Sequence, residues 1–266
     1  MPVDFQNIDT DYRLVYNNSN NYIRRNHMLK IENLTKSYGS KVAVDNLSLH
    51  IEKGDMFAFI GHNGAGKTTT IKAATGIMDF DSGNIFIDGI SIKENPIACK
   101  RKIAYLPDNP DLYEFMSGIK YLNFIADIFQ VPKKERAERI KKYGDMFEIT
   151  PNLASPISSY SHGMKQKIAI ISALIHSPKL LIMDEPFVGL DPKAAFLLKE
   201  EMREICKEGG AIFFSTHVLD VAEKLCNKIA IIKSGKLIRC GSMEEIKGDE
   251  SLEDVFLELE GAKENV

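Results

Sequence analysis

The sequence contains the stretch Gly61-His62-Asn63-Gly64-Ala65-Gly66-Lys67-Thr68, which fits the pattern G-x-x-x-x-G-K-[ST]. The glycines let the backbone curl so that successive N–H groups face an anion, and a following helix adds its positive dipole end. We expect every residue of this loop to border a bound nucleotide. Lys67 is expected to reach the β- and γ-phosphates, Thr68 to place its hydroxyl on Mg²⁺, and Thr69 to touch the α-phosphate.

The residues around this phosphate-binding loop (the P-loop, residues 61–68) predict alternating strands and helices. A continuous apolar run at residues 56–60 precedes the loop, as expected for a strand buried on both faces, and a helix should run from Lys67 to about residue 77. Further strands are expected at residues 29–34, 47–51, 180–183, 211–215 and 228–232, with a turn at residues 39–40 and a hairpin turn around residues 81–84. A helical pattern is expected at about residues 112–149. The pattern predicts an α/β fold: a P-loop NTPase (RecA-like) core with a mainly parallel sheet, an antiparallel β subdomain and a mostly helical insertion at about residues 110–160.

The chain is expected to form one ATPase domain at residues 28–247, followed by a C-terminal tail at residues 248–266. Residues 1–27 hold six Asn and three Tyr without a sustained period. This N-terminal extension can be a disordered segment, a start placed upstream of the native one at Met28, or an arm that binds a partner.

Composition excludes several classes of protein. The 266 residues are 44% hydrophobic and 27% charged, with a net charge of −3, so no general attraction to nucleic acid is expected. No apolar run approaches the roughly 18–20 residues that span a bilayer, and no signal peptide is evident. Four scattered cysteines form no C-x-x-C pair, which favours a reducing cytoplasm over a disulfide framework or a zinc site.

A second chemical element follows the apolar run at residues 180–183. Asp184 and Glu185 come at the carboxyl end of that expected strand, where ligands bind in open α/β sheets. Because neighbouring side chains at the end of a strand point to different sides, the two carboxylates can have different roles. Asp184 can hold Mg²⁺ while Glu185 polarises a water for attack on the γ-phosphate. Taken alone, the pair could also be an acidic turn. A guanine-reading N-K-x-D motif is not completed, because Ala230 follows Asn227-Lys228-Ile229.

The segment Tyr160-Ser161-His162-Gly163-Met164-Lys165-Gln166 (the signature segment) resembles the L-S-G-G-Q signature of ATP-binding cassette (ABC) ATPases. Other motifs of that family occur in order. Tyr38 lies where the family has its adenine-stacking aromatic, Gly189-Leu190-Asp191-Pro192 looks like the D-loop, and Ser215-Thr216-His217 resembles the switch-histidine motif. The resemblance covers residues 28–261.

The resemblance implies a dimer that binds ATP and Mg²⁺ between two cassettes, in a homodimer or in a heterodimer with a similar chain. Ser161 and Gly163, at a second helix N-terminus, would face the γ-phosphate bound by the other subunit, and Asp191 would border the same interface. His217 would contact the γ-phosphate and act with Glu185 in catalysis. Without the family resemblance, the alternative interpretations are that Ser161 is a helix cap, that His217 is a structural residue and that Tyr38 is a packed aromatic.

The resemblance also implies integral membrane permease subunits as partners, with no nucleic acid. The chain would then lie in the cytoplasm, peripheral on the inner face of the membrane. The variant signature segment and the run of residues 251–256 are similar to cassettes of bacterial exporters with separate permease chains. The rivals are a soluble ABC ATPase that acts on DNA or ribosomes, and a non-hydrolysing ATP-binding switch.

Asp108 is the main departure from the family pattern, which usually has Gln after an apolar segment such as residues 103–107. A carboxylate near a γ-phosphate is repelled unless Mg²⁺ lies between them. We therefore expect Asp108 on the metal side of the site, with a solvent-facing turn residue as the alternative. His62 and Met164 carry no separate expectation beyond their motifs.

Overall fold

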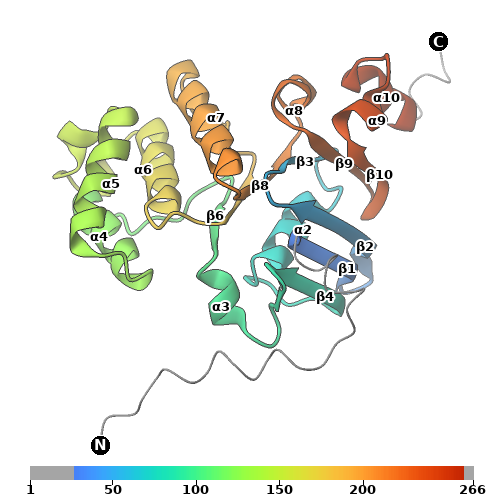
Figure 1. The fold of residues 1–266 in the computed structure, drawn as a ribbon, viewed down its shortest axis with the longest axis horizontal. Coiled ribbons are helices and arrows are strands. Elements are labelled where there is room, and N and C mark those ends of the chain that lie inside the picture. The colour runs from blue at the N-terminus through green and yellow to red at the C-terminus, as the bar shows by residue number, and fades with distance from the viewer. Residues whose placement is uncertain (1–26, 261–266) are drawn as a thin grey trace, which may run out of the picture.

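The structure is a computed structural model that describes residues 27–260. The expectations for residues 1–26 and 261–266 lie outside this part. The order of elements confirms the α/β fold: a parallel sheet and an antiparallel sheet pack together, and helices gather at both ends (Figure 1).

The main sheet has six strands in the order β10-β9-β3-β8-β7-β6. The five strands from β9 to β6 pair in parallel, and only the edge strand β10 runs antiparallel. The parallel neighbours in this order are separated along the chain by crossover connections, whereas β9 and β10 follow one another directly. The strands are β3 (Met56–Ile60), β6 (Ile103–Leu106), β7 (Leu180–Asp184), β8 (Ala211–Thr216), β9 (Lys228–Lys233) and β10 (Lys236–Ser242).

The second sheet is antiparallel, in the order β2-β1-β4-β5. Its strands are β1 (His27–Tyr38), β2 (Lys41–Glu52), β4 (Ser82–Ile87) and β5 (Ile90–Ser91). The expected turn around residues 81–84 is wrong, because residues 82–84 belong to β4. Gly83 is needed there for the close approach to β1, since a Cβ would lie 2.6 Å from the Asn33 carbonyl. The turn falls at Asp88-Gly89, both with positive φ.

The helices flank the sheets and extend beyond them (Figure 1). None of those in the described part of the chain is long and apolar enough to cross a membrane. Residues 112–149, expected to be helical, contain α4 and α5, and α10 follows the domain boundary expected at residue 247. The helices are α2 (Lys67–Ala74), α3 (Pro96–Lys100), α4 (Gly118–Ile128), α5 (Lys133–Met146), α6 (His162–Leu174), α7 (Pro192–Lys207), α8 (Leu219–Leu225), α9 (Met243–Lys247) and α10 (Leu252–Glu260), with short 3₁₀ turns at Thr150–Asn152 and Ile157–Ser159.

The helix that follows the P-loop is shorter than expected. It ends at Ala74 rather than near residue 77, because Gly76 adopts a left-handed φ of 65° that stops the helix. Ile77 is therefore left outside the helix, with 58% of its surface exposed.

The core lies on both faces of β3, as its continuous apolar sequence predicts. Ala58 and Ile60 pack with the helical side of the molecule, whereas Phe57 and Phe59 pack with α2 and the antiparallel sheet. All four are at most 1% exposed. Burial on both faces fixes the end of β3, and with it the position at which the P-loop begins.

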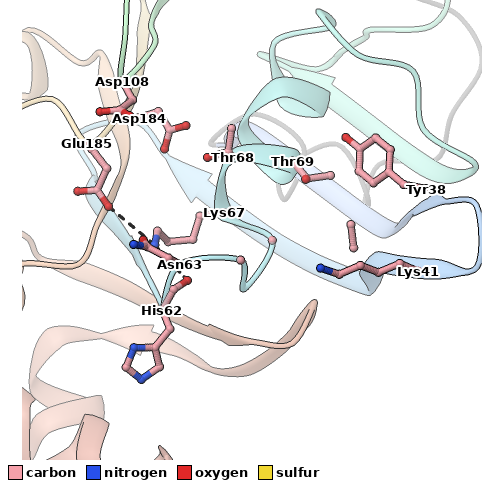
Figure 2. A pocket seen from close by; sticks show the side chains of 13 residues that line it. Tyr38, Lys41, His62, Asn63, Lys67, Thr68, Thr69, Asp108, Asp184 and Glu185 are labelled. Carbon is pink, nitrogen blue, oxygen red and sulfur yellow. Dashed lines mark hydrogen bonds and ion pairs between the residues drawn. The ribbon is translucent and has the colours of Figure 1, made fainter.

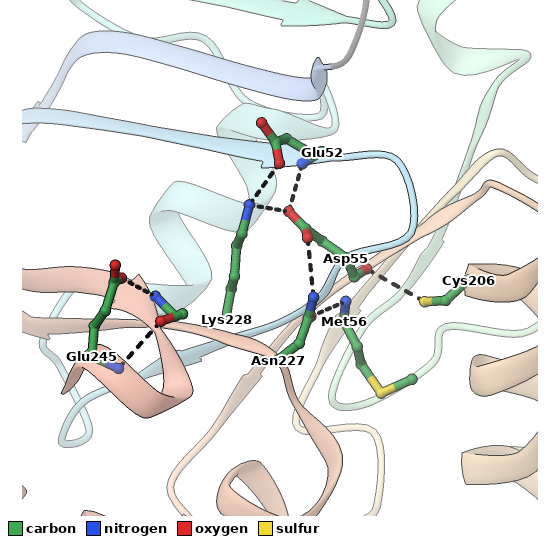
Figure 3. A network of polar contacts seen from close by, with 8 residues as sticks. Glu52, Asp55, Met56, Cys206, Asn227, Lys228 and Glu245 are labelled. Carbon is green, nitrogen blue, oxygen red and sulfur yellow. Dashed lines mark hydrogen bonds and ion pairs between the residues drawn. The ribbon is translucent and has the colours of Figure 1, made fainter. Parts of the chain in front are cut away.

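A buried polar network ties the start of β3 to its neighbours (Figure 3). Asp55, 4% exposed, accepts hydrogen bonds from the Glu52 backbone N–H at 2.7 Å and from Asn227 Nδ2 at 3.2 Å. Lys228 Nζ lies 3.0 Å from Asp55 and 2.9 Å from Glu52. Asn227 and Lys228, which would begin a guanine motif, thus have a structural role at the start of β3.

Candidate functional site

A cavity of about 300 Å³ lies where the P-loop meets the carboxyl ends of the parallel strands (Figure 2). It collects residues from both sheets and from the loop after β6. They are Tyr38, Lys41, Ala43, His62, Asn63, Gly64, Gly66, Lys67, Thr68, Thr69, Asp108, Asp184 and Glu185. Most residues expected to bind nucleotide or metal are thereby brought together. Gly61 and Ala65 are buried in the loop behind it.

The P-loop curls around the N-terminus of α2. Gly66 precedes that helix with φ 109°, and a Cβ there would lie 2.5 Å from the Ala43 carbonyl oxygen. Glycine is therefore required both for the backbone conformation and for the approach of β2. The N-terminal end of α2 opens toward the cavity, where its N–H groups can receive an anion.

Lys67 is almost entirely buried, with 6% of its surface exposed. Its ammonium donates to the Gly61 carbonyl at 2.6 Å and lies 3.8 Å from Glu185 Oε1. Burial lowers the pKa of Lys67, and the charges of Glu185 and Asp184 oppose that shift. A buried cation at the end of a loop of N–H donors is suited to a phosphate group.

Ser215, at the end of β8, organises both carboxylates. Its hydroxyl donates to Asp184 Oδ1 and accepts a hydrogen bond from the Glu185 backbone N–H at 3.1 Å. Asp184 is 3% exposed, whereas Glu185 has a left-handed φ of 48°, which is uncommon for a residue with a side chain. The backbone turn separates the two carboxylates, as their adjacent places on the strand end predicted.

His217 lies beside Glu185. Its Nδ1 atom is 3.0 Å from Glu185 Oε1, and the imidazole is 56% exposed on its other side. Among the described residues, Oε1 accepts no well-aligned hydrogen bond, although the His217 nitrogen lies close to it. The arrangement leaves a carboxylate oxygen at the cavity with capacity to accept a proton or to orient a water.

Tyr38 and Lys41 border the other end of the cavity, on either side of the β1–β2 turn. The Tyr38 residue is 52% exposed, and its hydroxyl contacts Met78 Sδ at 2.7 Å. Its ring is thus accessible for stacking. Lys41 extends toward the P-loop in Figure 2, and the sequence analysis missed it. Its signal was a cation just after the turn that follows Tyr38.

The oxygen donors at the cavity fit Mg²⁺. Thr68, Asp184 and Asp108 supply one hydroxyl and two carboxylates, and Mg²⁺ is usually held by one or two carboxylates together with substrate phosphates. No cluster of three or more His, Cys, Asp or Glu side chains that could hold a metal occurs among residues 27–260. A cation here would therefore need the phosphate oxygens of a nucleotide. Asp108 is exposed to solvent and also lines the cavity, which leaves both of its expected roles open.

Ser161, Gly163 and Asp191 lie outside this cavity. Ser161 Oγ caps α6 by accepting from the Met164 N–H at 3.3 Å, and Asp191 caps α7 by accepting from the Ala194 N–H at 2.8 Å. Lys167 Nζ, 2.8 Å from Asp191, also lowers the pKa of that carboxyl. Within one chain, the ion pair of Lys167 with Asp191 joins α6 to residues 189–192. Ser161, Gly163 and Asp191 therefore make contacts of their own and do not line the phosphate cavity.

A second, apolar cavity of about 320 Å³ opens between the end of α2, β6 and the helices α4 and α6. We call it the insertion groove. Ile77, 58% exposed, stands at this groove. Its other lining residues are Thr75, Lys100, Ile103, Ala104, Tyr105, Tyr121, Ile125, Phe129, Ser172, Ala173 and His176.

The fold and the P-loop define the class of this protein as a P-loop nucleoside triphosphatase. A family model described as ABC transporter matches residues 44–188. The linearmycin resistance ATP-binding protein LnrL of Bacillus subtilis is 34% identical over 219 residues, which cover 82% of this chain and 70% of that protein.

Similar solved structures belong to the same family. A structure described as the ATP binding subunit of an ABC transporter has a TM-score of 0.85 and 34% identity, and covers 88% of this chain and 99% of that one. CbiO1 of Clostridium perfringens is described as part of the ABC transporter complex CbiONQ. It has a TM-score of 0.72 and 28% identity, and the match covers 90% of this chain and 98% of CbiO1. The chain belongs to the ATPase subunits of ABC transporters.

Proposed function

We propose that this chain powers export through separate permease subunits by hydrolysing Mg²⁺-ATP between two cassettes. The observation that carries the proposal is the single cavity that joins the P-loop, a buried lysine and the carboxylate of Glu185. Export is favoured by the relative named for linearmycin resistance, because outward transport of a toxic compound produces resistance.

The proposed roles belong to residues of the cavity and to His217, which lies beside Glu185. Tyr38 stacks on the adenine, the P-loop N–H groups and Lys67 bind the phosphates, and Thr68, Asp184 and Asp108 hold Mg²⁺. Glu185 accepts a proton from the attacking water, and His217 steadies the γ-phosphate beside it. When bound, Mg²⁺ neutralises part of the phosphate charge.

A second cassette completes the site. The cavity lacks the signature segment of its own chain, since Ser161 and Gly163 lie outside it. Ser161 caps the N-terminus of α6. The positive end of this helix dipole can receive a phosphate bound by another subunit. Two chains, arranged head to tail, would each supply what the other lacks.

The insertion groove is the proposed docking site for a cytoplasmic helix of a permease. Its lining is mostly apolar, and the exposed Ile77 stands at it. CbiO1, similar along 90% of this chain, is described as part of a transporter complex. An apolar helix face in the groove would bury the exposed side chains.

The experiment is purification of the tagged chain from detergent-solubilised membranes of cells that also express a permease encoded beside it. We expect the permease to co-purify, and Ile77→Asp to abolish its recovery. Ile97→Asp is the matched control, because Ile97 is 62% exposed on α3 and does not line the groove. Loss with both variants, or recovery of ribosomes or DNA in place of a permease, would contradict the proposal.

A further inference from the structure

The C-terminal helix α10 touches the P-loop through one pair of rings. The imidazole of His62 and the ring of Phe256 have centroids 5.1 Å apart at an interplanar angle of 63°, an edge-to-face contact. In Figure 2 the His62 side chain points away from the cavity that its own loop borders. His62, expected to bind nucleotide as part of the loop, therefore directs its side chain to α10 instead.

Helix α10 is firmly held in this position. Leu252, Val255 and Phe256 are at most 7% exposed and belong to the main hydrophobic core. The Leu252 N–H donates to Glu223 Oε2 on α8 at 3.0 Å. At the other end, Lys233 Nζ donates to the Leu259 carbonyl at 3.2 Å. A ring carried by this helix is a fixed contact for the loop.

The side of the P-loop that faces the β9–β10 turn has a backbone hydrogen bond and borders a cavity. The Gly235 N–H donates to the Ala65 carbonyl at 2.8 Å, which holds the middle of the loop against the β9–β10 turn. A cavity of about 170 Å³ lies next to this bond, lined by His62, Asn63, Gly64, Ala65, Lys233 and Ser234. Because space remains on this side, the contact of His62 with Phe256 restricts a part of the loop that borders a cavity.

We propose that Phe256 is a positioning residue for nucleotide binding and acts through His62. Holding the P-loop in its phosphate-binding curve before ATP arrives removes an ordering cost from the binding step. Loss of the contact would weaken ATP binding while the groups that perform hydrolysis stay in place. The inference rests on the proposed function, in which the P-loop binds the phosphates.

Nucleotide affinity of Phe256→Ala, measured by calorimetry on the full-length chain, tests the proposal. We expect the Kd for Mg²⁺-ATP to rise about threefold to tenfold, the size of one lost aromatic pair. KM should rise by a similar factor, with kcat nearly unchanged. Val255→Ala is the matched control, since it removes a side chain of similar burial from the same helix and leaves the ring pair intact.

His62→Ala provides a second variant, because His62 is exposed and its loss does not open the core. The double variant Phe256→Ala with His62→Ala should bind ATP no more weakly than whichever single variant has the lower affinity for ATP. Unchanged affinity in Phe256→Ala, equal loss in Val255→Ala, or fully additive losses would overturn the proposal. A wild-type chain that binds no ATP would instead contradict the proposed function.

Discussion

His217 Nδ1 and Lys67 Nζ approach the same carboxylate oxygen, Glu185 Oε1, at 3.0 and 3.8 Å. The proposed general base therefore lies between two nitrogen groups. A triphosphate would compete with Glu185 for Lys67, because phosphate oxygens offer the ammonium a larger negative charge. Entry of ATP would thus release the carboxylate toward water.

Proton uptake on ATP binding follows from the environment of Lys67. Burial lowers the pKa of its ammonium below the ordinary 10.5. Phosphate anions favour the charged form and should raise that pKa. At alkaline pH values between the free and bound pKa, ATP binding should take up protons, and its affinity should fall as pH rises.

Calorimetry of ATP binding in two buffers of different ionisation enthalpy measures this uptake. Lys67→Arg is the control, because a guanidinium stays protonated throughout this range and its variant should take up no proton at that position. Proton release by the wild-type chain, or equal uptake in Lys67→Arg, would refute the assignment.

Lys41 should strengthen ATP binding through its charge. It lines the cavity, and none of the ion pairs found between residues 27 and 260 involves it. Lys41→Gln should weaken ATP binding about threefold to tenfold at low salt, and the difference should shrink as salt is added. Lys236→Gln is the control, because Lys236 does not line the cavity and its ammonium lies 3.4 Å from the Asp45 carboxylate. Equal losses in both variants would show a general charge effect.

Asp108→Asn separates the two interpretations of this residue. If the carboxylate helps to hold the metal, the Mg²⁺ concentration for half-maximal ATPase activity should rise severalfold. ATP affinity without metal should stay level or improve, because a negative charge near the phosphates is removed. An unchanged Mg²⁺ dependence would make Asp108 a turn residue at the edge of the cavity.

Asp55→Ala should destabilise the fold and leave the site intact. The buried network in Figure 3 would lose the acceptor for the Glu52 N–H and for Asn227, and Lys228 would lose a partner. We expect a cost of roughly 2–4 kcal/mol and a Tm lower by about 5–10 °C, with kcat per folded molecule unchanged.

Asp45→Ala is the control for Asp55. Its side chain is 44% exposed and pairs only loosely with Lys236, so Tm should change little. Equal Tm values for the Asp55 variant and the wild type would show that the network contributes nothing to stability.

The sequence predicted the parallel strands β3, β7, β8 and β9 because each is a short apolar run, and β3 and β7 are buried along their whole length. It did not predict β6, a four-residue strand at the edge of the sheet. The P-loop and the Asp184-Glu185 pair also follow from local sequence, and the fold brings them to one cavity. The hairpin turn expected around residues 81–84 was misplaced because glycine occurs in a strand as well as in a turn. Gly83 allows β4 to approach β1 closely, whereas Asp88 and Gly89 form the turn.

Other features of the site depend on contacts between distant segments. The bonds of Ser215 to Asp184 and Glu185 arise only when β7 and β8 pair. The contact of His62 with Phe256 joins the P-loop to the last described helix. No local pattern of residue types reports such pairs, so the sequence could propose the residues but not these relationships.

The turnover of Glu185→Gln in the purified chain tests the central claim most directly. The amide keeps the size of the side chain but accepts a proton poorly, so ATP should still bind while kcat falls at least about a hundredfold. The same variant should form an ATP-dependent dimer by light scattering, whereas the wild type without nucleotide should be mostly monomeric. Near-normal hydrolysis without a dimer would contradict the account.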